Sequence, residues 1–343
     1  MVSLKYNLNE TVSKPHFRNK KTNYMKVLAN DGISKSGVKA LENAGFEVLT
    51  VKVAQEQLEN YINKNNIDVI LVRSATKVRK DLIDACPSLK VIGRGGVGMD
   101  NIDVEYARSK DIKVINTPAA SSSSVAELVF AHLFGGVRNL HDANRTMPLE
   151  GDSRFKELKK TYGGGKELRG KTLGIIGFGR IGREVAKIAL GCGMKVIASD
   201  NQVGEADITL DFYDGQQITL KIKTEPVSEL IKHSDFITLH VPAQKKYVIG
   251  EAEIEQMKDG AAIINAARGG VIDEKALLEA LEKGKISFAA LDTFENEPSP
   301  EIKILMNGNI SLSPHIGAAT EEAQDRIGVE LAEQIVSILK PVN

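Results

Sequence analysis

Three charged side chains in the second half of the chain could perform acid–base chemistry on an alcohol. Arg268, Glu297 and His315 each follow a short apolar segment. Oxidation of an alcohol by hydride transfer requires a base for the hydroxyl proton, and histidine serves as a base near neutral pH. A carboxylate beside the histidine orients the ring and stabilises its cationic form. Arginine can hold a substrate carboxylate through two parallel hydrogen bonds.

The segments before these residues place them at one edge of a sheet. Strands are expected at Ala262–Asn265, Phe288–Leu291 and Ile310–Leu312. Because ligands bind beyond the carboxyl ends of parallel strands, the three side chains are expected to meet over one cleft. Each residue taken singly has a structural alternative. His315 could cap a strand, Arg268 could pair with an acid, and Glu297 could lie on a solvated loop. Their joint position at successive strand ends favours a reaction centre.

A glycine-rich turn indicates the cofactor. A strand at Thr172–Ile176 leads through Gly177, Gly179 and Gly182 into a helix. The glycines allow a tight turn, close approach of the backbone to a pyrophosphate, and close packing of helix on strand. Asp200, after the next strand, would accept the adenosine ribose hydroxyls and repel a 2′-phosphate, which favours NAD over NADP. The alternative is an ordinary strand–helix turn with an unrelated aspartate.

Two series of strands alternating with helices predict an α/β protein with two doubly wound parallel sheets. The strands expected in the first series are Lys26–Ala29, Phe46–Val51, Val69–Val72, Lys90–Ile92 and Lys113–Ile115. The second series adds Thr172–Ile176, Lys195–Ala198 and Phe236–Leu239 to the three strands named above. The segment Val203–Lys223 is expected to form a small hairpin or a loop.

Two long helices complete the expected fold. One runs from about Ser124 to Thr146 and is apolar over much of its surface. Such a helix is expected either between domains or subunits, or in the core of one subunit. The other is amphipathic and closes the chain at Ala319–Leu339.

The overall composition excludes several classes of protein. The 343 residues suit two domains, and the formal net charge of zero gives no reason to expect nucleic acid or a membrane as partner. Two cysteines, Cys86 and Cys192, suit a reducing cytoplasm, and no histidines lie at metal-ligand spacing. Residues 1–24 are basic and lack an apolar face, so we expect a disordered leader or, as the alternative, a basic docking arm.

Four motifs together resemble the D-isomer-specific 2-hydroxyacid dehydrogenase family. They are Gly177–Gly182, Asn265–Asp273, Asp292–Pro298 and Ser313–Thr320. The resemblance implies a Rossmann NAD-binding domain, residues 118–318, inserted into a flavodoxin-like substrate domain made of residues 25–117 and 319–343. It also implies that Arg268, Glu297 and His315 are catalytic. The cofactor contacts that it implies are Gly177, Gly179, Arg180, Ile181, Gly182, Asp200, Val241, Ala266, Arg268, Asp292, and 315–318, which includes His315, Gly317 and Ala318.

Within this family, two N-terminal stretches most resemble the members that oxidise D-3-phosphoglycerate to begin serine synthesis. They contain Arg73, Ser74, Arg94 and Gly96, which the resemblance assigns to the substrate together with Arg268. Two additional arginines at strand ends suit a phosphate as well as a carboxylate. The printed sequence has no stretch matching the C-terminal regulatory domain of some relatives, so feedback through such a domain is not expected.

Two other functions remain open. A glyoxylate or hydroxypyruvate reductase would use the same scaffold without Arg73 and Arg94 as a phosphate clamp. An NAD(H)-sensing interaction protein of the corepressor type could retain the whole catalytic set. For either enzyme we expect a small-molecule substrate and a homodimer or dimer-based tetramer.

Overall fold

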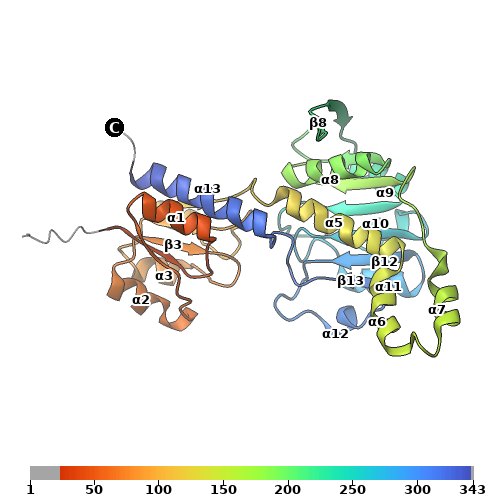
Figure 1. Ribbon diagram of the computed structural model, residues 1–343, viewed down its shortest axis with the longest axis horizontal. Coiled ribbons are helices and arrows are strands. Elements are labelled where there is room, and N and C mark those ends of the chain that lie inside the picture. Colours follow the sequence, from red (N-terminus) through yellow and green to blue (C-terminus); the bar gives the residue numbers. More distant parts are fainter. Residues whose placement is uncertain (1–23, 341–343) are drawn as a thin grey trace, which may run out of the picture.

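The computed structural model describes residues 24–340; the predicted leader, apart from Tyr24, lies outside the described residues. Figure 1 shows two α/β domains side by side, with the last helix crossing back to the domain in which the chain begins. The predicted fold class, two parallel-sheet domains, is confirmed. No helix within residues 24–340 is long and apolar enough to cross a membrane.

The smaller domain contains a five-stranded parallel sheet. Its order, β2-β1-β3-β4-β5, is that of flavodoxin-like folds. The strands are β1 (Lys26–Ala29), β2 (Glu47–Leu49), β3 (Val69–Val72), β4 (Val91–Arg94) and β5 (Lys113–Asn116). Compared with the prediction, β2 is shorter and β4 continues to Arg94, so this arginine is the last residue of its strand.

Helices cover both faces of the smaller sheet. They are α1 (Lys35–Asn43), α2 (Leu58–Asn65, preceded by the 3-10 turn η1, Gln55–Gln57), α3 (Lys80–Ala85), α4 (Val104–Ser109) and the C-terminal α13 (Glu321–Leu339). The apolar stripe of α13, Ile327, Leu331 and Ile335, recurs every four residues and is buried against this sheet. The last helix therefore belongs to the core of the first domain.

The larger domain contains a six-stranded parallel sheet of order β13-β12-β11-β10-β6-β7. Its strands are β6 (Thr172–Ile176), β7 (Lys195–Ser199), β10 (Phe236–Leu239), β11 (Ala261–Asn265), β12 (Ile286–Leu291) and β13 (Ile310–Leu312). The strand order reverses between β6 and β10, which is where open α/β sheets bind ligands. The third strand of the usual Rossmann order is reduced here to a single bridge between Ala198 and Thr224.

Two layers of helices enclose the larger sheet. On one face lie α5 (Ser122–Val137) and α8 (Arg180–Gly191). The other face packs against α9 (Val227–His233), α10 (Glu251–Gln256) and α11 (Glu274–Glu282), while α12 (Ile302–Leu305) precedes β13. Because both faces are covered, every residue of β10 and β11 is buried, which explains why Thr238 and Asn265 are the only polar residues in these two strands.

The single long helix predicted at Ser124–Thr146 is wrong. The chain forms α5 and then α6 (Leu140–Glu150), because Asn139 adopts a left-handed conformation with φ of 53° and interrupts the helix. One face of α5 packs in the core of its own subunit while Phe134 on α5 is exposed, and α6 buries no residue completely. The chain continues through α7 (Phe155–Thr161) and the 3-10 turn η2 (Tyr162–Gly164).

The segment Val203–Lys223, left open between a loop and a hairpin, forms an antiparallel hairpin. Its strands are β8 (Glu205–Asp211) and β9 (Gln217–Lys223). Ala206 and Ile208 are buried and anchor it in the core cluster that contains residues of α8. Figure 1 shows that the hairpin projects from the larger domain.

Candidate active site

The glycine-rich turn between β6 and α8 is built as the motif predicts. Gly177 has φ of 96°, a conformation that favours glycine. A Cβ atom at Gly182 would stand 2.2 Å from the Gly177 carbonyl oxygen, so only glycine lets the helix pack this close. Helix α8 begins at Arg180 and directs its free backbone N–H groups and positive dipole end toward the cleft between the domains.

Asp200 follows β7 and ties this turn to the next strand. Its Oδ2 accepts a hydrogen bond from the Phe178 backbone N–H at 2.7 Å. Its Oδ1 accepts from the N–H groups of Gln202 at 2.8 Å and Val203 at 3.0 Å. Burial raises the pKa of Asp200, but these three bonds outweigh burial and hold the pKa below its usual range. The ionised carboxylate agrees with the prediction that Asp200 repels the 2′-phosphate of NADP and favours NAD, and this role stays a prediction.

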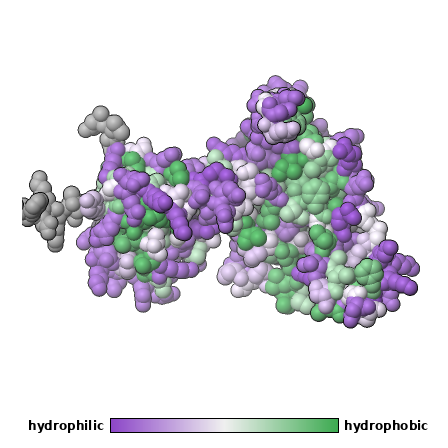
Figure 2. All heavy atoms as spheres, viewed as in Figure 1, coloured by the Kyte–Doolittle hydropathy of each residue, from purple (hydrophilic) through white to green (hydrophobic). Residues whose placement is uncertain are grey.

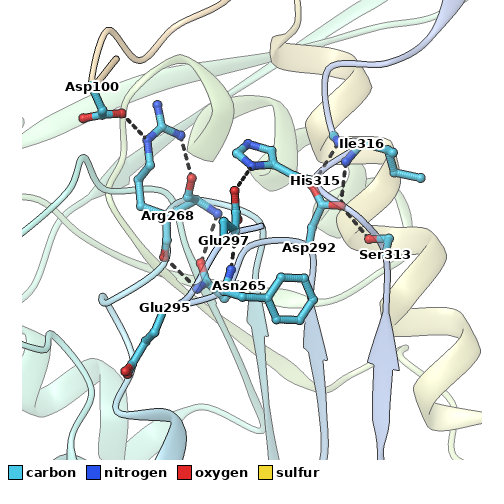
Figure 3. Close-up of polar contacts among 12 residues, drawn as sticks. Asp100, Asn265, Arg268, Asp292, Glu295, Glu297, Ser313, His315 and Ile316 are labelled. Atoms are coloured by element: carbon cyan, nitrogen blue, oxygen red, sulfur yellow. Dashed lines mark hydrogen bonds and ion pairs between the residues drawn. The ribbon is translucent and has the colours of Figure 1, made fainter. Parts of the chain in front are cut away.

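His315 and Glu297 form a hydrogen-bonded pair at the ends of neighbouring strands (Figure 3). His315 Nδ1 lies 2.8 Å from Glu297 Oε2, and Oε1 accepts the Phe294 backbone N–H at 3.0 Å. Because an ionised carboxylate can only accept, Nδ1 carries the proton and Nε2 is left able to accept one. Burial raises the pKa of Glu297, but the hydrogen bond and charge of His315 outweigh it, and the net pKa is lowered.

The loop that carries His315 is held by Asp292. Asp292 Oδ1 accepts hydrogen bonds from the Ile316 backbone N–H at 2.8 Å and the Ser313 hydroxyl at 2.6 Å, and Oδ2 accepts from the Gly317 N–H at 2.9 Å. His315 itself has φ of 54°, a strained backbone conformation for a residue with a side chain. Asp292, predicted as a cofactor contact, lies in the cleft wall and also anchors this loop.

Arg268 is positioned by a local turn and by the other domain. The Asn265 side chain donates to the Arg268 carbonyl oxygen at 2.9 Å and accepts the Ala267 N–H at 3.0 Å, which shapes the turn after β11. The guanidinium Nε donates to Asp100 Oδ2 at 3.1 Å. Asp100 comes from the loop after β4 in the smaller domain (Figure 3). Sequence reasoning missed Asp100, because nothing in its surroundings indicated a partner in the second domain.

Three arginines converge from the two domains. Arg73 follows β3, Arg94 ends β4, and both line the same cleft as Arg268. Burial, followed by the charges of Arg268 and Arg73, lowers the pKa of Arg94 to about 10. Within residues 24–340, the Nε atom of Arg94 is buried without a hydrogen-bond partner. An unpaired buried donor among like charges is typical of a site completed by an anion.

Glycines make room for two of these guanidinium groups. A Cβ atom at Gly96 would stand 1.7 Å from Arg94 Nη1, and one at Gly98 would stand 1.7 Å from Arg268 Nη2. The loop after β4 therefore allows both arginines to lie directly against its backbone. Gly96 was predicted to contact the substrate, but its neighbours Gly95, Val97 and Gly98 line the cleft and Gly96 does not.

The cleft has a volume of about 440 Å³, within the usual range for sites of small ligands. Of the predicted residues, it is lined by Arg73, Ser74, Arg94, Gly179, Arg180, Ile181, Val241, Ala266, Arg268, Asp292, His315, Gly317 and Ala318. Gly177, Gly182, Asp200 and Glu297 do not line it; they shape or support the turn and the loop that do. No group of three or more His, Cys, Asp or Glu residues within 24–340 is arranged to hold a metal ion.

His240 is a cleft residue that sequence reasoning did not select. It lies at the end of β10, where its Nε2 is 3.0 Å from Thr238 Oγ1. Its Nδ1 is buried without a partner within the described residues, and burial lowers the pKa of His240 to about 3. The ring is therefore neutral and offers a hydrogen-bonding atom to a bound molecule. Together with the glycine turn and Asp200, it fits a dinucleotide at the point where the strand order reverses.

Comparison with known proteins agrees with this geometry. Residues 130–317 match the family described as D-isomer specific 2-hydroxyacid dehydrogenase, NAD binding domain. A hydroxypyruvate reductase of Thermotoga maritima is 46% identical over 317 residues, covering 90% of this chain and 97% of that protein. A D-3-phosphoglycerate dehydrogenase of Methanocaldococcus jannaschii is 44% identical over 319 residues, covering 92% of this chain and 58% of that protein.

The solved structures agree as well. The crystal structure of a glyoxylate reductase from Paecilomyes thermophila aligns with a TM-score of 0.77 at 30% identity, covering 93% of this chain and 96% of that one. The chain spans little more than half the length of the D-3-phosphoglycerate dehydrogenase relatives. The matched domain carries the cofactor, and its strand ends carry Arg268, Glu297 and His315. This protein belongs to the NAD-dependent D-isomer-specific 2-hydroxyacid dehydrogenase family.

Proposed function

We propose that the protein oxidises D-3-phosphoglycerate to 3-phosphohydroxypyruvate with NAD. The observation that carries this proposal is the convergence of Arg73, Arg94 and Arg268 on one cleft, with a buried donor of Arg94 unpaired. A plain 2-hydroxy acid brings one carboxylate, which Arg268 alone can hold. Two further arginines suit a second anionic group, and a phosphate matches their hydrogen-bond donors.

In the proposed reaction the substrate hydroxyl faces His315. Arg268 holds the carboxylate and polarises the neighbouring oxygen, while His315 Nε2 takes the hydroxyl proton. Glu297 stabilises the imidazolium that forms. Bound NAD supplies the hydride acceptor, so the C–H bond breaks with its electron pair as the C=O bond forms. Arg73 and Arg94 hold the phosphate away from the reacting carbon.

Substrate preference tests the phosphate clamp directly. Oxidation or reduction is followed by NADH absorbance with 3-phosphoglycerate, hydroxypyruvate, glyoxylate, D-lactate and 2-oxoglutarate. We expect Arg73→Ala and Arg94→Ala to lower kcat/KM for 3-phosphoglycerate by roughly 10²-fold, and for glyoxylate by less than about fivefold. Arg108→Ala is the control, because Arg108 pairs with Glu105 on α4 in the same domain and does not line the cleft. Equal losses on both substrates would contradict the clamp.

A hydroxypyruvate or glyoxylate reductase is the second candidate. It is favoured by the Thermotoga maritima relative, which this chain matches over 97% of its length. The same panel decides, because a reductase would use hydroxypyruvate or glyoxylate well and 3-phosphoglycerate poorly. Absence of turnover with every acid would instead favour an NAD(H)-sensing interaction protein.

We also propose that two copies of the chain pair through the segment α5–α7. Phe134, Leu140, Leu149 and Phe155 are exposed by 48–80% of their surface on this segment. In Figure 2 apolar residues gather on the face of the larger domain where α5 and α6 lie. Patches of this kind mark subunit contacts. Leu149→Glu and Phe155→Glu should shift the mass in solution from dimer to monomer, and unchanged mass would exclude this surface.

We place the enzyme in the cytoplasm because both cysteines, Cys86 and Cys192, are free. Burial, followed by the charge of Glu59, raises the pKa of Cys86 to about 11. The Cys86 thiol is therefore unreactive near neutral pH.

A further inference from the structure

A buried polar chain connects helix α5 to the loop that carries His315. His132, only 7% exposed, lies on α5 between two serines of β13 and its loop. Its Nδ1 is 2.8 Å from Ser311 Oγ, and its Nε2 is 2.9 Å from Ser313 Oγ. Ser313 Oγ is in turn 2.6 Å from Asp292 Oδ1, the carboxylate that accepts the Ile316 and Gly317 N–H groups.

The carboxylate of Asp292 fixes the donor and the acceptor in each hydrogen bond of this series. Ionised Asp292 can only accept, so Ser313 donates its hydroxyl proton to Oδ1. Ser313 Oγ then accepts from the protonated Nε2 of His132, and Ser311 donates to the unprotonated Nδ1. Burial lowers the pKa of His132, the charge of Asp292 opposes this, and the net shift favours the neutral ring that the pattern requires.

The same helix holds the far end of the loop. Ser124 Oγ donates to the Gly317 carbonyl oxygen at 2.7 Å, and Ser124 lies about two turns before His132 on α5. Both contacts are buried. Helix α5 can lie this close to the sheet because a Cβ atom at Gly136 would stand 2.1 Å from the Phe288 ring. Helix α5 therefore contacts both ends of the loop that contains the strained backbone of His315.

We propose that His132 is a positioning residue for catalysis: it orients the Ser313 hydroxyl and, through Asp292, fixes the backbone on which His315 stands. The inference rests on the proposed function, in which His315 is the base. The residue types are those of a hydrolase triad, but here the carboxylate binds the serine rather than the histidine. All three side chains are less than 9% exposed, so no nucleophile reaches a substrate.

Two substitutions separate orientation from packing. His132→Leu fills similar space without hydrogen bonds, whereas His132→Gln keeps one donor and one acceptor. Val137→Ala, at the far end of α5, is the control for general destabilisation, because Val137 is 6% exposed and lacks a polar side chain. Activity is measured as NADH oxidation with 3-phosphohydroxypyruvate and with hydroxypyruvate. Amide hydrogen exchange reports on Ile316 and Gly317.

We expect His132→Leu to lower kcat roughly tenfold, because small displacements of a catalytic group are costly, and to leave KM for NADH within about twofold. His132→Gln should recover most of kcat. Exchange at Ile316 and Gly317 should accelerate in His132→Leu and stay close to wild type in Val137→Ala. This pattern would support the positioning role.

Three results would overturn it: unchanged exchange in His132→Leu, faster exchange with unchanged kcat, or an equal loss of kcat in Val137→Ala. Failure of the wild-type chain to oxidise NADH with either acid would instead reject the proposed function. In that case hydrogen exchange alone decides whether His132 holds the loop, and unchanged exchange again overturns the inference.

Discussion

The strands of both sheets end at the cleft, and the polar groups at these two sets of strand ends differ in whether they have hydrogen-bond partners. At the edge of the larger sheet, Glu297 binds His315 and Asp292 accepts three hydrogen bonds from one loop. At the edge of the smaller sheet, Arg94 keeps a buried Nε atom without a partner within the described residues. Glu297, His315 and Asp292 are thus already hydrogen-bonded in the free protein, whereas Arg94 has a donor left for an anion.

This difference separates chemistry from selectivity. Groups that move protons must be oriented before the substrate arrives, since reorientation during the reaction would raise the barrier. Groups that recognise the substrate gain by remaining unsatisfied until it binds, because a ligand lacking the phosphate leaves them unpaired. We therefore infer that the larger sheet carries the reacting groups and that the smaller sheet selects the substrate.

We expect the largest effect from replacing His315, the proposed base at the strand ends of the larger sheet. His315→Ala should lower kcat by at least ~10²-fold, because a positioned general base typically contributes about 10²–10⁴-fold to the rate. NADH binding, measured by its fluorescence, should change less than about twofold, since the glycine turn is intact. A variant that works at close to the native rate would remove His315 from this role.

Substitution of Asp200 tests whether the strand ends of the larger sheet also select the cofactor. Asp200→Ala should improve the NADP to NAD ratio of kcat/KM roughly fivefold to tenfold, because loss of a partly exposed like charge is worth on the order of 1 kcal/mol. Asp81→Ala, an exposed aspartate of the smaller domain, should leave the ratio unchanged. If both variants discriminate as the wild type does, Asp200 does not set the preference.

The Asp100–Arg268 ion pair connects the smaller domain to the arginine at the strand ends of the larger sheet. We expect a substrate carboxylate to compete with Asp100 for Arg268. Asp100→Asn should therefore lower KM for the hydroxy acid about twofold to fivefold, the range expected for a partly exposed ion pair, with kcat unchanged. An increase in KM would show that Asp100 orients Arg268 for the substrate instead.

The smallest expected effect concerns stability in acid. The pKa of Glu297 is lowered in the folded state, so its contribution is present above the ordinary value of 4.5 and is lost as the pH falls below it. Glu297→Gln should therefore lose less Tm than wild type between about pH 5 and pH 3. We expect a difference of roughly 1–2 °C, since the side chain is partly exposed. Glu255→Gln, an exposed glutamate of α10, should follow the wild type.

Local sequence was sufficient for most of the fold. Strands such as Val69–Val72 and Phe236–Leu239 lie where the apolar residues predicted them, because a strand buried on both faces is apolar at nearly every position. The glycine turn was also predictable, since its geometry depends on neighbours within six positions. The helix break at Asn139 was not, because the apolar pattern continues across it.

The sequence by itself determined the two sheets, the dinucleotide turn and the set of Arg268, Glu297 and His315 at successive strand ends. Their strand-end position follows from short-range patterns, although their roles stay a prediction. Only the tertiary structure decided what holds them. His132 and Ser313 are 181 residues apart, and Asp100 and Arg268 are 168 apart. The first pair meets because α5 packs against the larger sheet, and the second because the two domains meet at the cleft. No local pattern records which distant side chains this packing brings together.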